Sequence, residues 1–163
     1  MIKGNQKGKR FTARAKPEYD QKMVDIARTA RVVSGGRRFS FRVAVVIGNR
    51  KGSVAIGLGK STDTASAIDK AVRAAKKNIL KVPLTKNGSI PHEVEAKYAS
   101  SRIMIKPAQQ GRGLVAGSSV RTVLDFAGVK NANAKIFSRS KNKLNNAKAA
   151  LKALSQLDNK STR

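Results

Sequence analysis

Apolar and polar residues alternate along much of the first third of the chain, from Val24 onward. The alternation runs through VDIARTARVV, returns in FSFRVAVVIG after the segment SGGRR, and continues in residues 54–58 beyond the turn NRKG. A period of two is typical of a strand with one buried face. We therefore predict a three-stranded antiparallel sheet, in which Gly35 and Gly36 make the first turn because glycine readily adopts positive φ.

The apolar spacing becomes helical after the third strand. We predict a helix that has Ser61 or Thr62 as its N-cap and is ended by Pro83. Gly57 and Gly59, just before this helix, are assigned to close strand–helix packing. The expected inner row is Ala65, Ile68, Val72, Ala75 and Ile79. The opposite side presents Lys70, Arg73 and Lys77. A helix face of like charge is more typical of a contact surface than of intrahelical pairing.

A second module is predicted beyond the turn-rich segment LTKNGSIP. It contains a strand with Ile103 and Ile105, the glycine loop QQGRG, a helix in LVAGSSVRTVLDFAGV that stops at Gly128, the strand NAKIFS, and a last helix from about Asn142. The two helices are expected to bury Val120, Val123, Leu124 and Ala127, and Leu144, Ala147, Leu151 and Leu154. The predicted α+β chain is divided into a basic disordered tail (1–18), a first module (19–83), a second module (84–157) and a frayed end (158–163).

The charge balance limits the possible partners. Thirty-five Lys and Arg residues against nine Asp and Glu give a formal net charge of +26 over 163 residues. Such an excess repels itself unless a polyanion neutralises it, which favours nucleic acid. A membrane surface is the rival, but the sequence has no apolar run long enough to span a bilayer and no apolar signal-peptide centre. We therefore expect a cytoplasmic protein. The absence of cysteine fits a reducing compartment and leaves no disulfide or thiolate site.

The hexapeptide GLGKST resembles the end of a phosphate-binding loop. The complete motif requires a glycine five positions before Gly59, where this chain has Val54. We therefore reject a nucleotide site. Lys60 is interpreted instead as a residue that the start of a helix presents to a phosphate of nucleic acid.

A metal or acid–base site is also not expected. His92 is the only histidine, and in an extended segment its side chain and that of Glu93 point to opposite faces. The sequence offers no second histidine and no cysteine to complete a metal shell, and its serines have no base to activate them. We expect a protein that is not an enzyme, with no cofactor, no metal and no small-molecule substrate.

The expected mode of RNA recognition follows from the aromatic content. The chain has no Trp, and Phe39 and Phe41 alternate like core residues together with Val43, Val45 and Ile47. Exposed aromatic platforms for single strands are therefore not expected. Recognition of folded or double-stranded RNA through phosphates and 2′-OH groups fits better.

The segment ARVVSGGRRFSFRVAVVIGNRKGSVAIGLGK resembles the N-terminal part of the bacterial family of ribosomal protein five of the small subunit. The strings KKNILKVPL, IPHEVE, IKPA, GRGLVAG and VRTVLDFAGV follow in the order of that family. The resemblance covers residues 19–157. It implies a module like a double-stranded-RNA-binding domain, with a three-stranded antiparallel sheet plus a helix, followed by a two-layer α+β module. It also implies a structural protein that binds the 16S-type rRNA of the small subunit.

The same resemblance implies roles for particular residues and partners. Arg28 matches the base of a family loop that reaches toward the small-subunit head; the loop itself is matched by Ser34, Gly35, Gly36 and Arg37. Gly113 and Arg121 match positions at a contact with ribosomal protein four that is linked to decoding accuracy. The second module would face ribosomal protein eight. The protein would also lie near ribosomal protein three at the messenger-RNA entry.

Together these arguments define one predicted set of rRNA-binding residues. The set consists of Arg28, Ser34, Gly35, Gly36, Arg37, Arg38, Arg42, Lys51, Lys60, Lys70, Arg73 and Lys77. One alternative is a double-stranded-RNA-binding regulatory or chaperone module that acts away from the ribosome. Another is a basic protein of a membrane surface.

Overall fold

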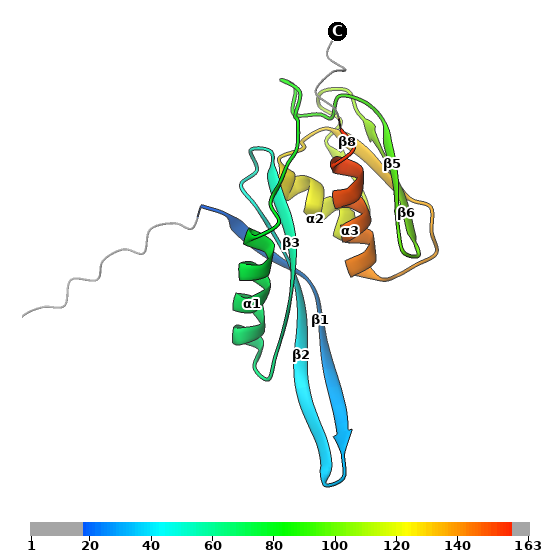
Figure 1. Ribbon diagram of the computed structural model, residues 1–163. Coiled ribbons are helices and arrows are strands. Elements are labelled where there is room, and N and C mark those ends of the chain that lie inside the picture. Colours follow the sequence, from blue (N-terminus) through cyan, green and yellow to red (C-terminus); the bar gives the residue numbers. More distant parts are fainter. Residues whose placement is uncertain (1–17, 158–163) are drawn as a thin grey trace, which may run out of the picture.

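The computed structural model describes residues 18–157, which form two α+β modules joined through a common core (Figure 1). Residue 18 apart, the predicted basic tail lies outside the described residues, as does the predicted frayed end at 158–163. The expected fold class is confirmed for the described part of the chain, since each module combines one sheet with packed helices.

The first module is built on an antiparallel sheet. Its strands are β1 (Asp20–Val33), β2 (Gly36–Gly48), β3 (Ser53–Ser61) and the two-residue β4 (Leu80–Lys81), in the order β1-β2-β3-β4. The three predicted strands are thus present, and β4 adds a short fourth beside β3. Strand β1 begins before the predicted start at Val24 because a register shift between Met23 and Asp25 interrupts the alternation there.

Helix α1 (Thr64–Lys76) differs at both ends from the sequence-based prediction. Its N-cap is Asp63, whose carboxylate accepts hydrogen bonds from the backbone N–H groups of residues 65 and 66. Ser61 and Thr62 were therefore wrong as N-caps, because β3 continues through residue 61. The helix also stops before Pro83, since the chain pairs as β4 from Leu80 onward.

Close packing between α1 and β3 depends on small residues on both elements. The buried side chains of α1 are Ala67, Ala71 and Ala75, whereas the predicted inner residue Ala65 is exposed. A Cβ atom at Gly57 would lie 1.9 Å from the carbonyl oxygen of Ala71, and one at Gly59 would lie 2.0 Å from that of Ala67. The packing role predicted for these two glycines is confirmed.

The second module is a two-layer α+β unit. Its sheet has the order β5-β6-β8-β7, with β5 (Val94–Tyr98), β6 (Ser101–Pro107), β7 (Leu114–Val115) and β8 (Ala132–Ile136). Only β7 and β8 run parallel within this sheet. Helices α2 (Ser118–Ala127) and α3 (Lys143–Leu154) cover one face. As predicted, α2 stops at Gly128 and α3 starts near Asn142; Gly128 is left-handed, and Asn142 is the N-cap. The segment predicted for the first of these helices was too long, because its residues 114–115 form β7.

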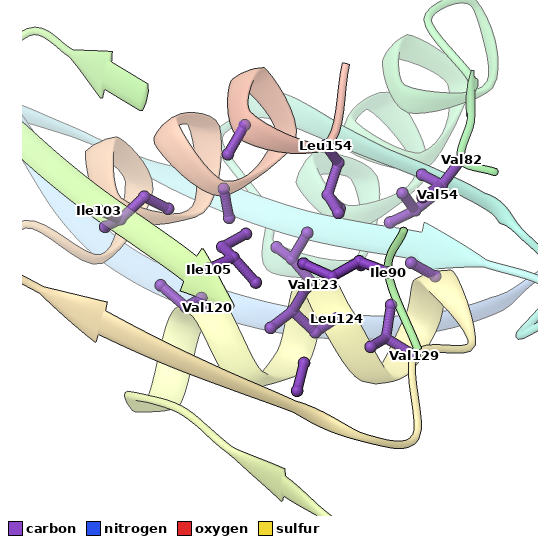
Figure 2. Packing of buried hydrophobic residues seen from close by; sticks show 14 of the residues in the cluster. Val54, Val82, Ile90, Ile103, Ile105, Val120, Val123, Leu124, Val129 and Leu154 are labelled. Carbon is purple, nitrogen blue, oxygen red and sulfur yellow. The ribbon is translucent and has the colours of Figure 1, made fainter. Parts of the chain in front are cut away.

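The second half of β2 is buried on both faces, because a different module covers each. Val43, Val45 and Ile47 pack against the alanines of α1. Val46, on the other face, belongs to the core of the second module, as does Val54 of β3. Figure 2 shows Val54 close to Val82 and directed into the core that also contains Ile90, Val123 and Leu154. The prediction of one buried face was therefore wrong for residues 43–47.

Candidate nucleic-acid interface

The hairpin of β1 and β2 projects beyond the rest of the molecule as an arm, defined here as residues 28–41 (Figure 1). Strand β3 pairs with β2 only as far as the pair Phe41–Ser61, so the outer part of the arm is a two-stranded ribbon. A two-residue turn, Ser34 and Gly35, closes it, and Gly36 follows with φ 139°. Isolated two-stranded ribbons are marginally stable in water, so this shape is typical of an element that has a binding partner.

One face of the hairpin carries two cross-strand pairs of like charge. Arg31 lies directly opposite Arg38, and Arg42 lies directly opposite Lys60. All four residues are exposed, and they point away from α1 because the neighbouring Val43 points toward it. We call them the cationic face. Like charges at directly opposite positions destabilise a sheet, and an anionic partner would convert this repulsion into attraction.

The local sequence contains nothing that could neutralise the cationic face from within. No Asp or Glu occurs between Ile26 and Thr62. Among residues 18–157 the ion pairs involve the cations Arg50, Arg102, Lys106 and Lys143, which all lie outside the arm. The electrostatic potential around the arm is therefore positive.

The face of the arm on the α1 side combines cations with an exposed aromatic ring. Arg28 and Arg37 point to this side, as does Phe39, whose exposed fraction is 42%. The expectation that Phe39 belongs to the core was wrong. The reason is geometric: β3 ends opposite Phe41, so no third strand continues beside Phe39.

The other predicted rRNA-binding residues lie on two further surfaces. Lys70, Arg73 and Lys77 are all exposed on α1 or at its C-terminal end. The Lys70 Nζ atom donates to the Ser61 hydroxyl at 3.3 Å. Lys51 is exposed in the turn between β2 and β3. Lys60 was expected at the start of the helix but lies within β3, where it joins the cationic face. The predicted set is therefore spread over both sides of the sheet and two turns.

Sequence reasoning left Arg31 out of the predicted site. The missing information was the hairpin register: with Ser34 and Gly35 as the turn, residues 33 and 36 pair, and Arg31 then falls opposite Arg38. A count outward from the turn could have found this pair, because the side-chain period of a strand is two.

The two positions matched to a protein interface lie at one edge of the second module. Gly113 has φ 75°, and its N–H donates to Asn131 Oδ1 at 3.2 Å. Arg121 is exposed on α2 and lines a groove of about 930 Å³ that also includes Leu114, the residue after Gly113. Three further cations line this groove, namely Lys22, Lys130 and Lys143.

Glu93 and Glu95, the two carboxylates near His92, take part in ion pairs. Glu95 accepts a hydrogen bond from Arg102 Nε, and this bond holds the pKa of the Glu95 carboxyl below its usual value. Glu93 lies 3.3 Å from Lys106 Nζ. Within residues 18–157 there is no group of three or more metal-ligating side chains.

The GKST tetrapeptide begins within β3 rather than in a phosphate-binding loop. Nor does any helix of residues 18–157 have the length and apolar character needed to cross a membrane.

Comparison with known protein families decides which of the possible RNA-binding proteins this is. The family model described as "Ribosomal protein S5, N-terminal domain" matches residues 19–83, and the one described as "Ribosomal protein S5, C-terminal domain" matches residues 96–162. The chain belongs to the ribosomal protein S5 family. The resemblance seen in the sequence is thus confirmed.

Curated relatives match along most of the S5 chain. Small ribosomal subunit protein uS5c of Cyanophora paradoxa is 46% identical over 142 residues, which cover 87% of this chain and 83% of the relative. The uS5c protein of Gracilaria tenuistipitata var. liui is 48% identical over 139 residues, with 85% and 80% covered. The uS5 protein of Thermosynechococcus vestitus is 47% identical over 140 residues, with 86% and 80% covered.

Membership of the S5 family settles the broad role of the protein. It is a structural, non-enzymatic component of the small ribosomal subunit, and it associates there with rRNA and other ribosomal proteins. The expected location on the ribosome and the expectation that the protein is not an enzyme are thereby confirmed.

Proposed function

We propose that the protein binds small-subunit rRNA chiefly through phosphate contacts made by the cationic face. The pairs Arg31–Arg38 and Arg42–Lys60 are the observation that carries this proposal. Side chains of like charge are held directly opposite one another, and the intervening sequence supplies no carboxylate. A phosphate placed between the two members of a pair would be attracted by both, so RNA binding relieves the repulsion within the free protein.

A second phosphate contact is assigned to α1. Lys70, Arg73 and Lys77 share one side of the helix, because residues three, four and seven apart lie on the same side. This side faces away from the sheet, so it cannot contact the same stretch of RNA as the cationic face. The protein is therefore suited to lie between RNA segments, with Ser34 and Arg37 at the arm and Lys51 at the turn making further contacts.

The finer roles concern the second module and remain part of the proposal. We assign Gly113 and Arg121 to the contact with ribosomal protein four, where they would contribute to decoding accuracy. The basic groove beside Arg121 supports a contact with an acidic surface. We also place the protein next to ribosomal protein eight and near ribosomal protein three, at the messenger-RNA entry region. In subunits reconstituted with Arg121→Ala, an altered rate of misreading is the expected result.

Salt titration of rRNA binding tests the principal proposal. The affinity of the full chain for small-subunit rRNA is measured across a series of salt concentrations for wild type, Arg38→Gln/Arg42→Gln and the control Lys97→Gln/Lys135→Gln on the outer face of the second sheet. Removal of one phosphate contact lowers the slope of log K against log salt by roughly 0.7–0.9. The arm variant should bind more weakly and with a shallower slope, while the control keeps both properties of wild type. Equal slopes for all three proteins would refute phosphate binding by the cationic face.

Cosedimentation separates a ribosomal role from action away from the ribosome. The wild-type protein should remain with small subunits through washes in high salt. Release in every wash, with undiminished binding to free double-stranded RNA, would favour the regulatory or chaperone alternative.

A further inference from the structure

We propose that the stacked side chains of Arg28 and Phe39 form a binding site for one unpaired nucleobase of the RNA. This inference rests on the proposed rRNA-binding function and adds a contact of a different chemical kind. The guanidinium carbon of Arg28 lies 3.6 Å from the centroid of the Phe39 ring. That separation corresponds to direct contact between flat groups, at about 3.5–4.0 Å.

The ring lies where neighbouring side chains leave it uncovered. Phe39 is paired with Ala30, whose side chain is a single methyl group, and 42% of Phe39 is exposed. Val32, on the same face and nearer the tip, is 75% exposed. In contrast, Phe41 is partly buried because β3 pairs beside it. The arm therefore presents an apolar strip, made of Phe39, Ala30 and Val32, on one face. Apolar surface that is grouped on one exposed face is a feature of interaction sites.

The charge of the arm selects RNA over an apolar protein surface as the occupant. Arg28 and Arg37 flank the strip, the cationic face lies on the opposite side of the hairpin, and no acidic residue occurs between Ile26 and Thr62. An apolar protein segment would leave these charges unpaired. A splayed-out base brings its own phosphate and a flat aromatic surface together. Unpaired bases stack on aromatic rings and on guanidinium planes in RNA complexes.

The two faces of the arm then have different tasks. The cationic face positions the arm through phosphates, which carry no sequence information, whereas the Arg28–Phe39 pair detects that a base is unstacked. The guanidinium of Arg28, whose carbon lies over the Phe39 ring, can continue the stack on its other side, because the faces of a guanidinium carry no hydrogen-bond donors. A lysine in place of Arg28 would retain the charge without this planar surface.

Two RNA probes distinguish stacking from phosphate binding. One is a duplex that contains a single bulged 2-aminopurine; the other is the same duplex without the bulge. The full-length wild-type protein should prefer the bulged duplex by about tenfold and change the fluorescence of the bulged base. Phe39→Ala and Arg28→Lys should both lose this preference. Phe39→Ala, which removes no charge, should keep the affinity and the salt dependence for the uninterrupted duplex. Phe39→Tyr, which retains a ring, should keep the preference.

Each possible outcome decides the matter. If wild type binds the two duplexes equally and leaves the fluorescence unchanged, the base site is refuted and the phosphate contacts stand. If Arg28→Lys retains the preference, stacking on the guanidinium is refuted. If wild type binds neither duplex, the base site and the RNA-binding function that it depends on both fail. Thermal unfolding of each variant checks that the fold is kept, as expected for substitutions on an exposed surface.

Discussion

The backbone N–H of Arg50, in the turn between β2 and β3, donates a hydrogen bond of 3.1 Å to the carbonyl oxygen of Phe126 near the end of α2. Gly52 donates in the same way to Ala127, at 2.8 Å. The last carbonyl groups of a helix have no partner within that helix. Backbone N–H groups of the β2–β3 turn in the first module therefore supply partners for the last carbonyl groups of α2 in the second module. The side chain of Arg50 adds an ion pair with Asp125 at 3.7 Å.

This joint predicts a large effect for Gly48→Ala. A Cβ atom at Gly48 would lie 2.2 Å from the Phe126 carbonyl oxygen, so the turn and α2 would have to separate. We expect a loss of about 1–3 kcal/mol in the free energy of unfolding, measured by urea denaturation. Gly35→Ala is the matched control, because nothing lies within 4 Å of a Cβ atom at that position. Equal stability of the two variants would contradict the proposed packing.

The cationic face predicts that removal of a charge stabilises the free protein. Arg38→Gln ends the repulsion with Arg31 and should raise the free energy of unfolding by about 0.2–1 kcal/mol in the absence of RNA. The gain should shrink as salt is added. Arg37→Gln is the control on the same strand, because it faces Val32 rather than a cation. A gain of the same size in the control would indicate a general effect of net charge.

The turn of the arm predicts separate effects on function and on folding. At Gly36 φ is 139°, and a Cβ atom would meet nothing within 4 Å. Gly36→Asp and Gly36→Ala therefore share the same backbone strain, but only the aspartate adds a negative charge beside the RNA. Their melting temperatures should agree, and only Gly36→Asp should incorporate poorly into small subunits. If Gly36→Ala incorporates as poorly, then strain and not charge is the cause.

The N-cap of α1 can be tested by comparison of neighbouring residues. Asp63→Ala removes the acceptor for two backbone N–H groups and should lower the free energy of unfolding by about 1 kcal/mol. Thr62→Ala should change it little, since Thr62 precedes the cap. Urea denaturation of both variants measures the difference. A larger loss for Thr62→Ala would show that the helix begins earlier.

The Glu95–Arg102 pair predicts a specific dependence on pH. The hydrogen bond from Arg102 lowers the pKa of Glu95 in the folded protein. A lowered carboxyl pKa contributes stability that is present above the usual pKa of the unfolded chain and is lost as pH falls through the folded value. Wild type should therefore unfold at a higher temperature than Glu95→Gln at neutral pH, and the difference should vanish in acid. Because both side chains are exposed, the effect should be small.

Local patterns predicted the elements but not the way in which they pack. The presence of strand β2, the stop of α2 at Gly128 and the start of α3 near Asn142 all depend on neighbouring residues, and all were correct. The burial of Val46 depends on the second module, which lies across the sheet from α1. A strand that is covered on both faces has no alternation of buried and exposed residues. This is why the sequence predicted one buried face for residues 43–47, where the structure has two.

The sequence predicted the basic character of the candidate site, but it predicted only some of the residues that form it. A basic surface follows from charge alone, and Arg38 and Arg42 were chosen correctly as exposed cations. The partner Arg31 depended on the register, and the exposure of Phe39 depended on where β3 ends. The register could have been counted outward from the turn, whereas the end of β3 beside β2 depends on how a separate segment pairs.

Strand β2 runs without a break from Gly36 at the tip of the arm to Gly48 at the joint, over 13 residues. At the usual rise per residue this is a rod of roughly 40 Å. Its inner end is held between the two modules, which pack on opposite faces of the strand. A sideways force on the tip must therefore bend β2 or displace its contact with Phe126. Movement of the tip and movement of the second module are mechanically coupled in this way.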